Sequence, residues 1–224
     1  MIRTLVSFCI AVWLAQAQVA TKANERYQTE EGRARMMGGL LSPDREQQQR
    51  PAELVAALGI KPGTTVADIG SGPGFLLPYL SRATGPKGRV IAEDIFADML
   101  DKAKQKIAAE KLANVTTVLG TEDDPKLAEK VDLALMLEVY HHVNYPDRLL
   151  PRVRDSLRPG GRFIVVDYYR RPEAMAGGYA IEHIRADRDE FAREIEASGF
   201  RLKETRDHIP GKMYVLVFEA GEKK

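Results

Sequence analysis

The sequence predicts an α/β fold in which helices cover both faces of one doubly wound sheet. Short apolar runs of strand length alternate with longer runs of helical spacing from about residue 50 to residue 219. The run 131–137 is apolar on both faces, which is typical of a central parallel strand. The final two strand-like runs are joined at Pro210-Gly211, which indicates a closing antiparallel pair. Sheets of this kind bind ligands beyond the carboxyl ends of their strands, so we expect the functional residues there.

The expected elements follow one another along the chain. Residues 21–50 are polar, which predicts a flexible lead-in and then one helix that begins at Ser42 or Asp44 and continues to Gly59. Each later strand is an apolar run, and each later helix has apolar residues three or four positions apart. In order, we expect a strand at 65–69, a helix at 75–83, a strand at 89–94, a helix at 97–112, a strand at 114–120, a short helix at 125–130 capped by Asp124, a strand at 131–137, a helix at 147–157, a turn at 158–161, a strand at 162–169, a helix at 185–199, and strands at 200–209 and 212–220.

The length and charge of the chain limit its function. Its 224 residues fit one α/β domain, and a formal net charge of +1 gives no reason to expect a nucleic-acid or membrane partner. We therefore expect a domain over 50–219, preceded by the polar lead-in and helix at 18–49 and followed by a tail at 220–224.

Residues 1–17 have the layout of a cleavable secretory signal: Arg3, then an apolar run, then Ala15-Gln16-Ala17. The apolar run is shorter than the roughly 20 residues that span a bilayer. This pattern predicts export to the periplasm or beyond the cell, with no stable membrane span after cleavage. The alternatives are an uncleaved membrane anchor or a misassigned start codon and a cytoplasmic protein. The single cysteine, Cys9, lies in this segment, so the remaining chain has no disulfide and no thiol nucleophile.

A glycine-rich turn follows the first expected strand. Gly70, Gly72 and Gly74 alternate, whereas a dinucleotide fingerprint would have its third glycine at the position of Phe75. Asp68 precedes the glycines and would repel a pyrophosphate, by about 1 kcal/mol in partly solvated surroundings, but would attract an ammonium or sulfonium group. The turn therefore predicts a cationic ligand; the alternative is a glycine-rich turn beside a solvated carboxylate.

Acidic residues also follow the second and third expected strands. Glu93 or Asp94 lies where an acid binds ribose hydroxyls in nucleoside-binding sheets, and we favour Asp94 because Ile95 follows it in a hydrophobic slot. A helix cap is the alternative role for Asp94. Glu122 or Asp123 is placed to accept a hydrogen bond from the amine of an adenine, and the sequence leaves the choice between them open.

Five stretches resemble class I S-adenosylmethionine-dependent methyltransferases in order and spacing: VADIGSGPGF, VIAEDIF, TEDDP, VDLALMLEVYHHV and LRPGGRFIVVDY. More narrowly, the chain resembles bacterial small-molecule methyltransferases with a Tyr-His-His stretch after the fourth strand. The resemblance spans roughly residues 50–219 and implies S-adenosylmethionine as cofactor. It also implies a Rossmann-like seven-stranded sheet of order 3-2-1-4-5-7-6 with the last strand antiparallel. The resulting set of expected cofactor-binding residues is Asp68, Gly70, Ser71, Gly72, Gly74, Asp94, Ile95, Glu122, Asp123 and Glu138.

The methyl acceptor is expected over the ends of the fourth and fifth strands. Tyr140, His141 and His142 are candidates to hold or deprotonate it, since histidine titrates near neutral pH; packing at a helix start is the alternative. Asp167 is expected either to pair with a cationic acceptor or to orient a histidine. A metal site built from the histidines with His183 is not expected, because the sequence lacks His-x-x-x-His spacing and a supporting cysteine.

The expected function is therefore methyl transfer from S-adenosylmethionine to a small molecule. The alternative is an exported, non-catalytic nucleoside-binding module on the same sheet. An exported enzyme would have no obvious supply of this cofactor, and that is the observation in favour of the alternative.

Overall fold

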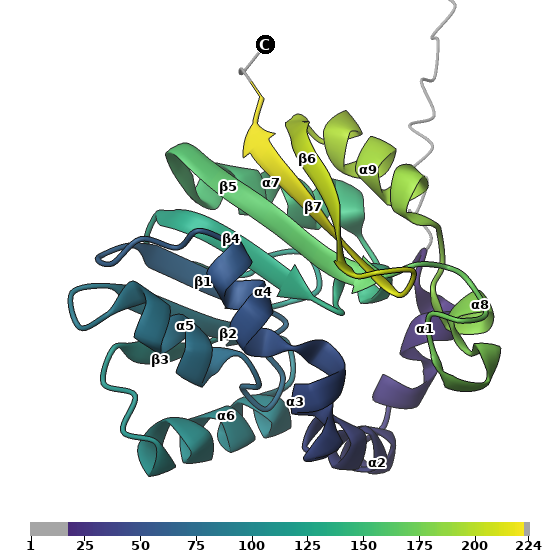
Figure 1. The fold of residues 1–224 in the computed structure, drawn as a ribbon, viewed down its shortest axis with the longest axis horizontal. Helices are drawn as coiled ribbons and strands as arrows, with labels where there is room; N and C mark the ends of the chain where they lie inside the picture. The colour runs from purple at the N-terminus through teal and green to yellow at the C-terminus, as the bar shows by residue number, and fades with distance from the viewer. Residues whose placement is uncertain (1–17, 222–224) are drawn as a thin grey trace, which may run out of the picture.

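The computed structural model describes residues 18–221, which form a seven-stranded sheet (Figure 1). Its order is β3-β2-β1-β4-β5-β7-β6, and β7 runs antiparallel to both neighbours while the other pairs are parallel. This confirms the expected fold class and strand order. The strands are β1 (Thr65–Ile69), β2 (Arg89–Asp94), β3 (Val115–Leu119), β4 (Val131–Leu137), β5 (Leu157–Tyr168), β6 (Phe200–Ile209) and β7 (Met213–Ala220).

Helices lie on both faces of the sheet (Figure 1). Alternate residues of β1 show the two layers, because Val66 packs in one buried cluster with α4 and α5 while Ala67 packs in another with α7 and α9. The helices are α1 (Thr21–Asn24), α2 (Glu30–Leu40), α3 (Asp44–Gln49), α4 (Pro51–Ala57), α5 (Leu77–Thr84), α6 (Ala97–Ala109), α7 (Pro146–Ser156), α8 (Ala180–His183) and α9 (Arg188–Ala197), with short 3-10 turns η1 (Glu25–Tyr27), η2 (Tyr140–His142) and η3 (Ala176–Gly178).

The N-terminal segment differs from the expectation. The residues expected to be a flexible lead-in form α1, η1 and α2, and the Thr29 side chain caps α2 by accepting a hydrogen bond from the Gly32 N–H. The single helix expected from Ser42 or Asp44 is instead two helices. Arg50 adopts a left-handed conformation (φ 43°) between them, because the proline at 51 disfavours a helical conformation in the residue before it and suits the first position of α4.

The short helix expected at 125–130 is also absent, and that prediction was wrong. Asp124 does not cap a helix: its Oδ1 accepts a hydrogen bond from the Lys126 N–H (2.8 Å), and Lys126 is left-handed (φ 48°). The turn expected at 158–161 is a bulge inside β5, since Leu157 pairs with Val131 before the register shifts.

The expected signal segment, residues 1–17, lies outside the described residues, so export stays a prediction. Among residues 18–221, no helix combines the length and the apolar character that a bilayer crossing requires.

Candidate active site

A cavity of about 360 Å³ opens at the carboxyl ends of β1, β2 and β4, a size typical of small-molecule sites. One wall is the glycine turn after β1 together with the end of β2. Further lining comes from the loop after β4 and from α8. The N-terminal segment closes the cavity with side chains that the sequence analysis did not anticipate; these include Asn24, Tyr27, Met36, Arg45 and Gln49.

The glycine turn brings two loops together. Gly70 has a φ of 71°, and a Cβ built on it would lie 2.5 Å from Val139 Cγ2. Only glycine therefore fits between β1 and the loop after β4. Gly72 also has a positive φ and lines the cavity. Gly74 does not line the cavity; a Cβ there would meet Leu77, so this glycine serves helix packing instead of the expected cofactor contact.

Asp68 lies behind the cavity wall. Its side chain is buried, and its Oδ2 accepts a hydrogen bond from Ser71 Oγ (2.8 Å). Ser71 lines the cavity and Asp68 does not, so the structure does not show the direct ligand contact expected for Asp68 and puts Ser71 between it and the cavity. Burial raises the pKa of Asp68 to about 6.

The two acids that end β2 both line the cavity. Asp94 accepts hydrogen bonds from the N–H groups of Gly72 (2.8 Å) and Phe96 (2.9 Å), and burial raises its pKa to about 6. Glu93 accepts a hydrogen bond from the Gly70 N–H (3.3 Å), while its Oε1 is buried without a hydrogen-bond partner among the described residues. Burial, and then the charge of Asp94, raise the pKa of Glu93 well above its usual range. A cationic ligand would relieve this concentration of buried negative charge.

Asp68→Asn is expected to remove a pH-dependent loss of stability. Because the folded-state pKa of about 6 lies above the ordinary value of 3.8, the folded protein holds a proton between about pH 4 and pH 6 that the unfolded chain has released. This group therefore lowers the stability of the ligand-free protein as pH rises through that window, by up to about 3 kcal/mol. Urea unfolding at pH 4 and pH 7.5 measures the free energy of unfolding of the wild type and of Asp68→Asn. Relative to the wild type, the variant should be more stable at pH 7.5 than at pH 4. An identical difference at both pH values would contradict the burial of a charged Asp68.

The loop after β3 separates the two candidate adenine contacts. Glu122 lines the cavity and its Oε1 accepts a hydrogen bond from Asn144 Nδ2 (2.9 Å). Asp123 points away: it does not line the cavity, and its Oδ1 accepts a hydrogen bond from Thr121 Oγ1 (2.8 Å). The geometry thus favours Glu122.

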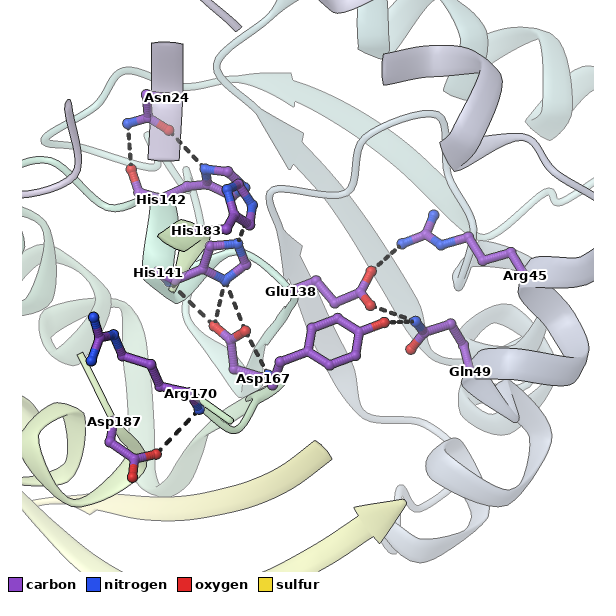
Figure 2. A network of polar contacts seen from close by, with 11 residues as sticks. Asn24, Arg45, Gln49, Glu138, His141, His142, Asp167, Arg170, His183 and Asp187 are labelled. Carbon is purple, nitrogen blue, oxygen red and sulfur yellow. Dashed lines mark hydrogen bonds and ion pairs between the residues drawn. The ribbon is translucent and has the colours of Figure 1, made fainter. Parts of the chain in front are cut away.

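Glu138 connects the end of β4 to the N-terminal segment (Figure 2). It has a positive φ of 57°, forms an ion pair with Arg45 (2.9 Å) and accepts a hydrogen bond from Gln49 Nε2. Gln49 Nε2 also donates to the Tyr168 hydroxyl (2.7 Å). A non-glycine residue held in this backbone conformation is typical of a functional site. Arg45 and Gln49 fix the carboxylate of Glu138 at the cavity wall.

Three histidines meet on the other side of the cavity (Figure 2). His141 Nδ1 contacts the carboxylate of Asp167 (2.8 Å), which confirms that Asp167 orients a histidine, and His141 Nε2 lies 3.2 Å from His183 Nε2. His142 Nδ1 lies 2.8 Å from Asn24 Oδ1. The contact with His183 was not expected, because α8 follows the histidine pair by some 40 positions in the chain.

Tyr140 does not join this group. It is fully buried, its hydroxyl donates to Glu194 Oε1 (2.6 Å), and its ring packs edge-on against Phe191. Tyr140 is thus part of the core under α9 and does not line the cavity, so its position does not support the expected contact with an acceptor.

The central part of the chain matches a known protein family. The model of a family described as "Methyltransferase domain" matches residues 67–163, which include the glycine turn, both acids of β2 and the histidine pair. This match, together with the relatives and solved structures below, supports a class I S-adenosylmethionine-dependent methyltransferase. The chain is 26% identical over 164 residues to the ubiquinone/menaquinone biosynthesis C-methyltransferase UbiE of Bordetella parapertussis. The alignment covers 73% of this chain and 63% of that protein. The chain is 33% identical over 113 residues to the arsenite methyltransferase of Halobacterium salinarum, and that alignment covers 50% and 29%. In both cases the chain spans less than two thirds of the relative.

Solved structures share the fold of this chain. A SAM-dependent methyltransferase from Aquifex aeolicus superposes with a TM-score of 0.74 at 23% identity, covering 82% of this chain and 96% of that one. The [4+2]-cyclase SpnF superposes with a TM-score of 0.65 at 15% identity, covering 78% and 82%. At these identities the likeness shows the fold alone.

S-adenosylmethionine is the cofactor of this methyltransferase family, and the cavity suits it. Its sulfonium and ammonium groups are cations, whereas the wall holds buried carboxylates, one of which, Glu93, retains an unpartnered oxygen. Asp94, Ile95 and Glu122, three of the residues expected to bind the cofactor, all line this cavity.

Glu122→Ala is expected to weaken S-adenosylmethionine binding by roughly 2- to 10-fold, the worth of one hydrogen bond at a partly solvated site. Asp123→Ala is the matched control, because it removes a neighbouring carboxylate that does not line the cavity. Calorimetric titration of both variants measures the two dissociation constants. Equal losses in both would contradict a specific contact at Glu122.

Proposed function

We propose that the protein transfers the methyl group of S-adenosylmethionine to a small-molecule acceptor. The observation that carries the proposal is that one cavity joins the acids of β2, on the cofactor side, to His141, His142 and His183 on the other side. The UbiE and arsenite methyltransferase relatives bear names of enzymes that act on small acceptors, which supports the same substrate class here. The near-neutral net charge supports neither a nucleic acid nor a membrane surface as partner.

Methyl transfer from a sulfonium is an in-line displacement that needs mainly correct placement of the two reactants. The Glu138 carboxylate, held by Arg45 and Gln49, lines the cavity, which supports a role for it beside the methionine part of the cofactor. An acceptor that arrives protonated must also lose a proton as its heteroatom attacks the methyl carbon. The histidines are the groups on the acceptor side that can assist this loss.

Burial keeps two of these histidines neutral. It lowers the pKa of His183 to about 4 and that of His142 well below its usual range, with neighbouring histidines as the next cause. A neutral imidazole has a lone pair with which to accept a proton or bind a cation. Asp167, fully buried, fixes the ring of His141 by its Nδ1 and directs Nε2 toward His183.

We also propose that residues 1–17 direct export of the protein. Export is the reason to consider a second function. An exported domain without a cofactor supply could serve as a non-catalytic nucleoside-binding module, and the SpnF cyclase illustrates that this fold is not tied to one activity.

One experiment separates the two functions. The protein is incubated with S-adenosylmethionine and pooled phenols, quinols, thiols and amines, and S-adenosylhomocysteine is quantified. We expect acceptor-dependent product that is lost in His141→Ala, although this variant still binds S-adenosylmethionine. Tight binding with no product above the acceptor-free control, across every pool, would favour the binding module.

A further inference from the structure

We propose that His141, His142 and His183 form a binding site for a divalent transition metal such as Zn²⁺, open on the cavity side to the methyl acceptor. This inference rests on the proposed function for the acceptor alone; metal binding itself is independent of it. The ligand class that follows is an acceptor with a hydroxyl, phenol or thiol group, whose oxygen or sulfur would complete the metal's coordination.

The spacing of the ring nitrogens fits a metal. One ring nitrogen from each of the three histidines lies within 4.8 Å of the others. His141 Nε2 and His183 Nε2 are 3.2 Å apart. Two nitrogens bound to a tetrahedral zinc at about 2.0–2.1 Å lie roughly 3.3 Å apart, so this pair already has the separation of two ligands.

Each histidine is held from behind by its other ring nitrogen. Nδ1 of His141 contacts Asp167 (2.8 Å), Nδ1 of His142 contacts Asn24 (2.8 Å), and Nδ1 of His183 contacts the Tyr179 hydroxyl (3.1 Å). Histidine ligands of metals characteristically donate their second N–H to a carboxylate, carbonyl or hydroxyl in this way. With Nδ1 engaged in all three rings, Nε2 is the nitrogen left for a metal in each (Figure 2).

The two Nε2 atoms can also share a cation. Without a metal, the Tyr179 hydroxyl can donate to Nδ1 of His183, and Nε2 of His183 can donate to His141; when both rings instead carry their proton on Nδ1, two lone pairs face each other at 3.2 Å and can bind one metal ion. Both rings are buried at the cavity wall. A metal shared by the two rings, with His142 as third ligand, satisfies every lone pair without charging a histidine.

Three protein ligands and an open position are the arrangement of catalytic rather than structural zinc sites. All three histidines line the cavity, so the open position faces the acceptor. A bound hydroxyl or thiol would release its proton to solvent, because coordination lowers its pKa. The resulting oxygen or sulfur anion would bond to the methyl carbon as the sulfonium C–S bond breaks, giving the methylated acceptor and S-adenosylhomocysteine with no change in oxidation state.

The test uses the full chain, purified without a histidine tag, stripped with a chelator and dialysed. Zn²⁺ is titrated by calorimetry, and Co²⁺ by its visible absorption, which reports tetrahedral coordination. We expect one metal per chain and at least 100-fold weaker binding in both His183→Ala and His142→Ala. His208→Ala is the matched control, since it removes the fourth histidine of the sequence, which does not line the cavity, and should bind metal as the wild type does.

Circular dichroism establishes whether each variant is folded. If one of His183→Ala and His142→Ala does not fold, the other still tests the site. Absence of stoichiometric binding in the wild type, or equal binding in all three variants, would overturn the site. S-adenosylmethionine is titrated into the same metal-free protein: binding of this cofactor without any metal site would overturn the inference and leave the proposed function standing.

Discussion

Replacing Gly70 with alanine is expected to abolish measurable S-adenosylmethionine binding and to destabilise the protein by about 2–5 kcal/mol. Two costs combine. A φ of 71° strains any residue with a Cβ, by about 1–2 kcal/mol, and the new methyl would lie 2.5 Å from Val139 Cγ2, an overpacking worth about 1–3 kcal/mol. Relief of the clash moves the loop that carries Glu138 and His141, so the cavity wall moves with it. Urea unfolding and calorimetric titration measure the two effects.

Two further variants separate these costs. Gly211→Ala has a similar φ of 72° but nothing within 4 Å of the new Cβ, so it should show the backbone cost alone and leave cofactor binding intact. Val139→Ala removes the two Cγ atoms that clash, so the double variant with Gly70→Ala should be less destabilised than the separate effects would give together. Strict additivity would show that Val139 is not the obstacle.

Asp94→Ala is expected to weaken S-adenosylmethionine binding at least tenfold. A hydrogen bond to a charged acceptor is worth about 1.5–3 kcal/mol, and Asp94 also holds the Gly72 N–H in the turn beneath the ligand. Asp101→Ala is the matched control, because Asp101 is an exposed acid of α6 that pairs with Lys104 away from the cavity. If the affinity of Asp94→Ala were unchanged, either Glu93 would make the ribose contact or the cofactor would not bind at this site.

The strands and the cofactor side of the cavity were predictable because their signals are local. Glycines that alternate after a strand, and an acid at the end of the next strand, occupy fixed places once the sheet is doubly wound. Bounds such as 65–69, 89–94 and 131–137 follow from apolar runs alone, and the structure confirms them.

The closing wall of the cavity could not be predicted, because it depends on contacts between distant residues. Nothing in a polar stretch near residue 45 indicates that Arg45 pairs with Glu138, and nothing near Asn24 indicates that it contacts His142. The polar side chains that suggested a flexible segment include residues that line the cavity.

The positions of adjacent residues on a 3-10 turn could not be predicted from the sequence either. Tyr140 and His141 are neighbours, yet one side chain enters the core and the other faces the cavity. Three residues are too few to show a hydrophobic periodicity, so the sequence does not indicate which of the two side chains is in the core. The meeting of His183 with the histidine pair likewise depends on where α8 folds back, which explains why a metal site was not expected.

The central claim is that buried carboxylates around the glycine turn select a positively charged sulfur nucleoside. The most direct measurement is calorimetric titration of the ligand-free protein with S-adenosylmethionine and, separately, with NAD. We expect micromolar binding of S-adenosylmethionine and no detectable heat with NAD, whose pyrophosphate the acids repel. Binding of NAD with no binding of S-adenosylmethionine would contradict the account.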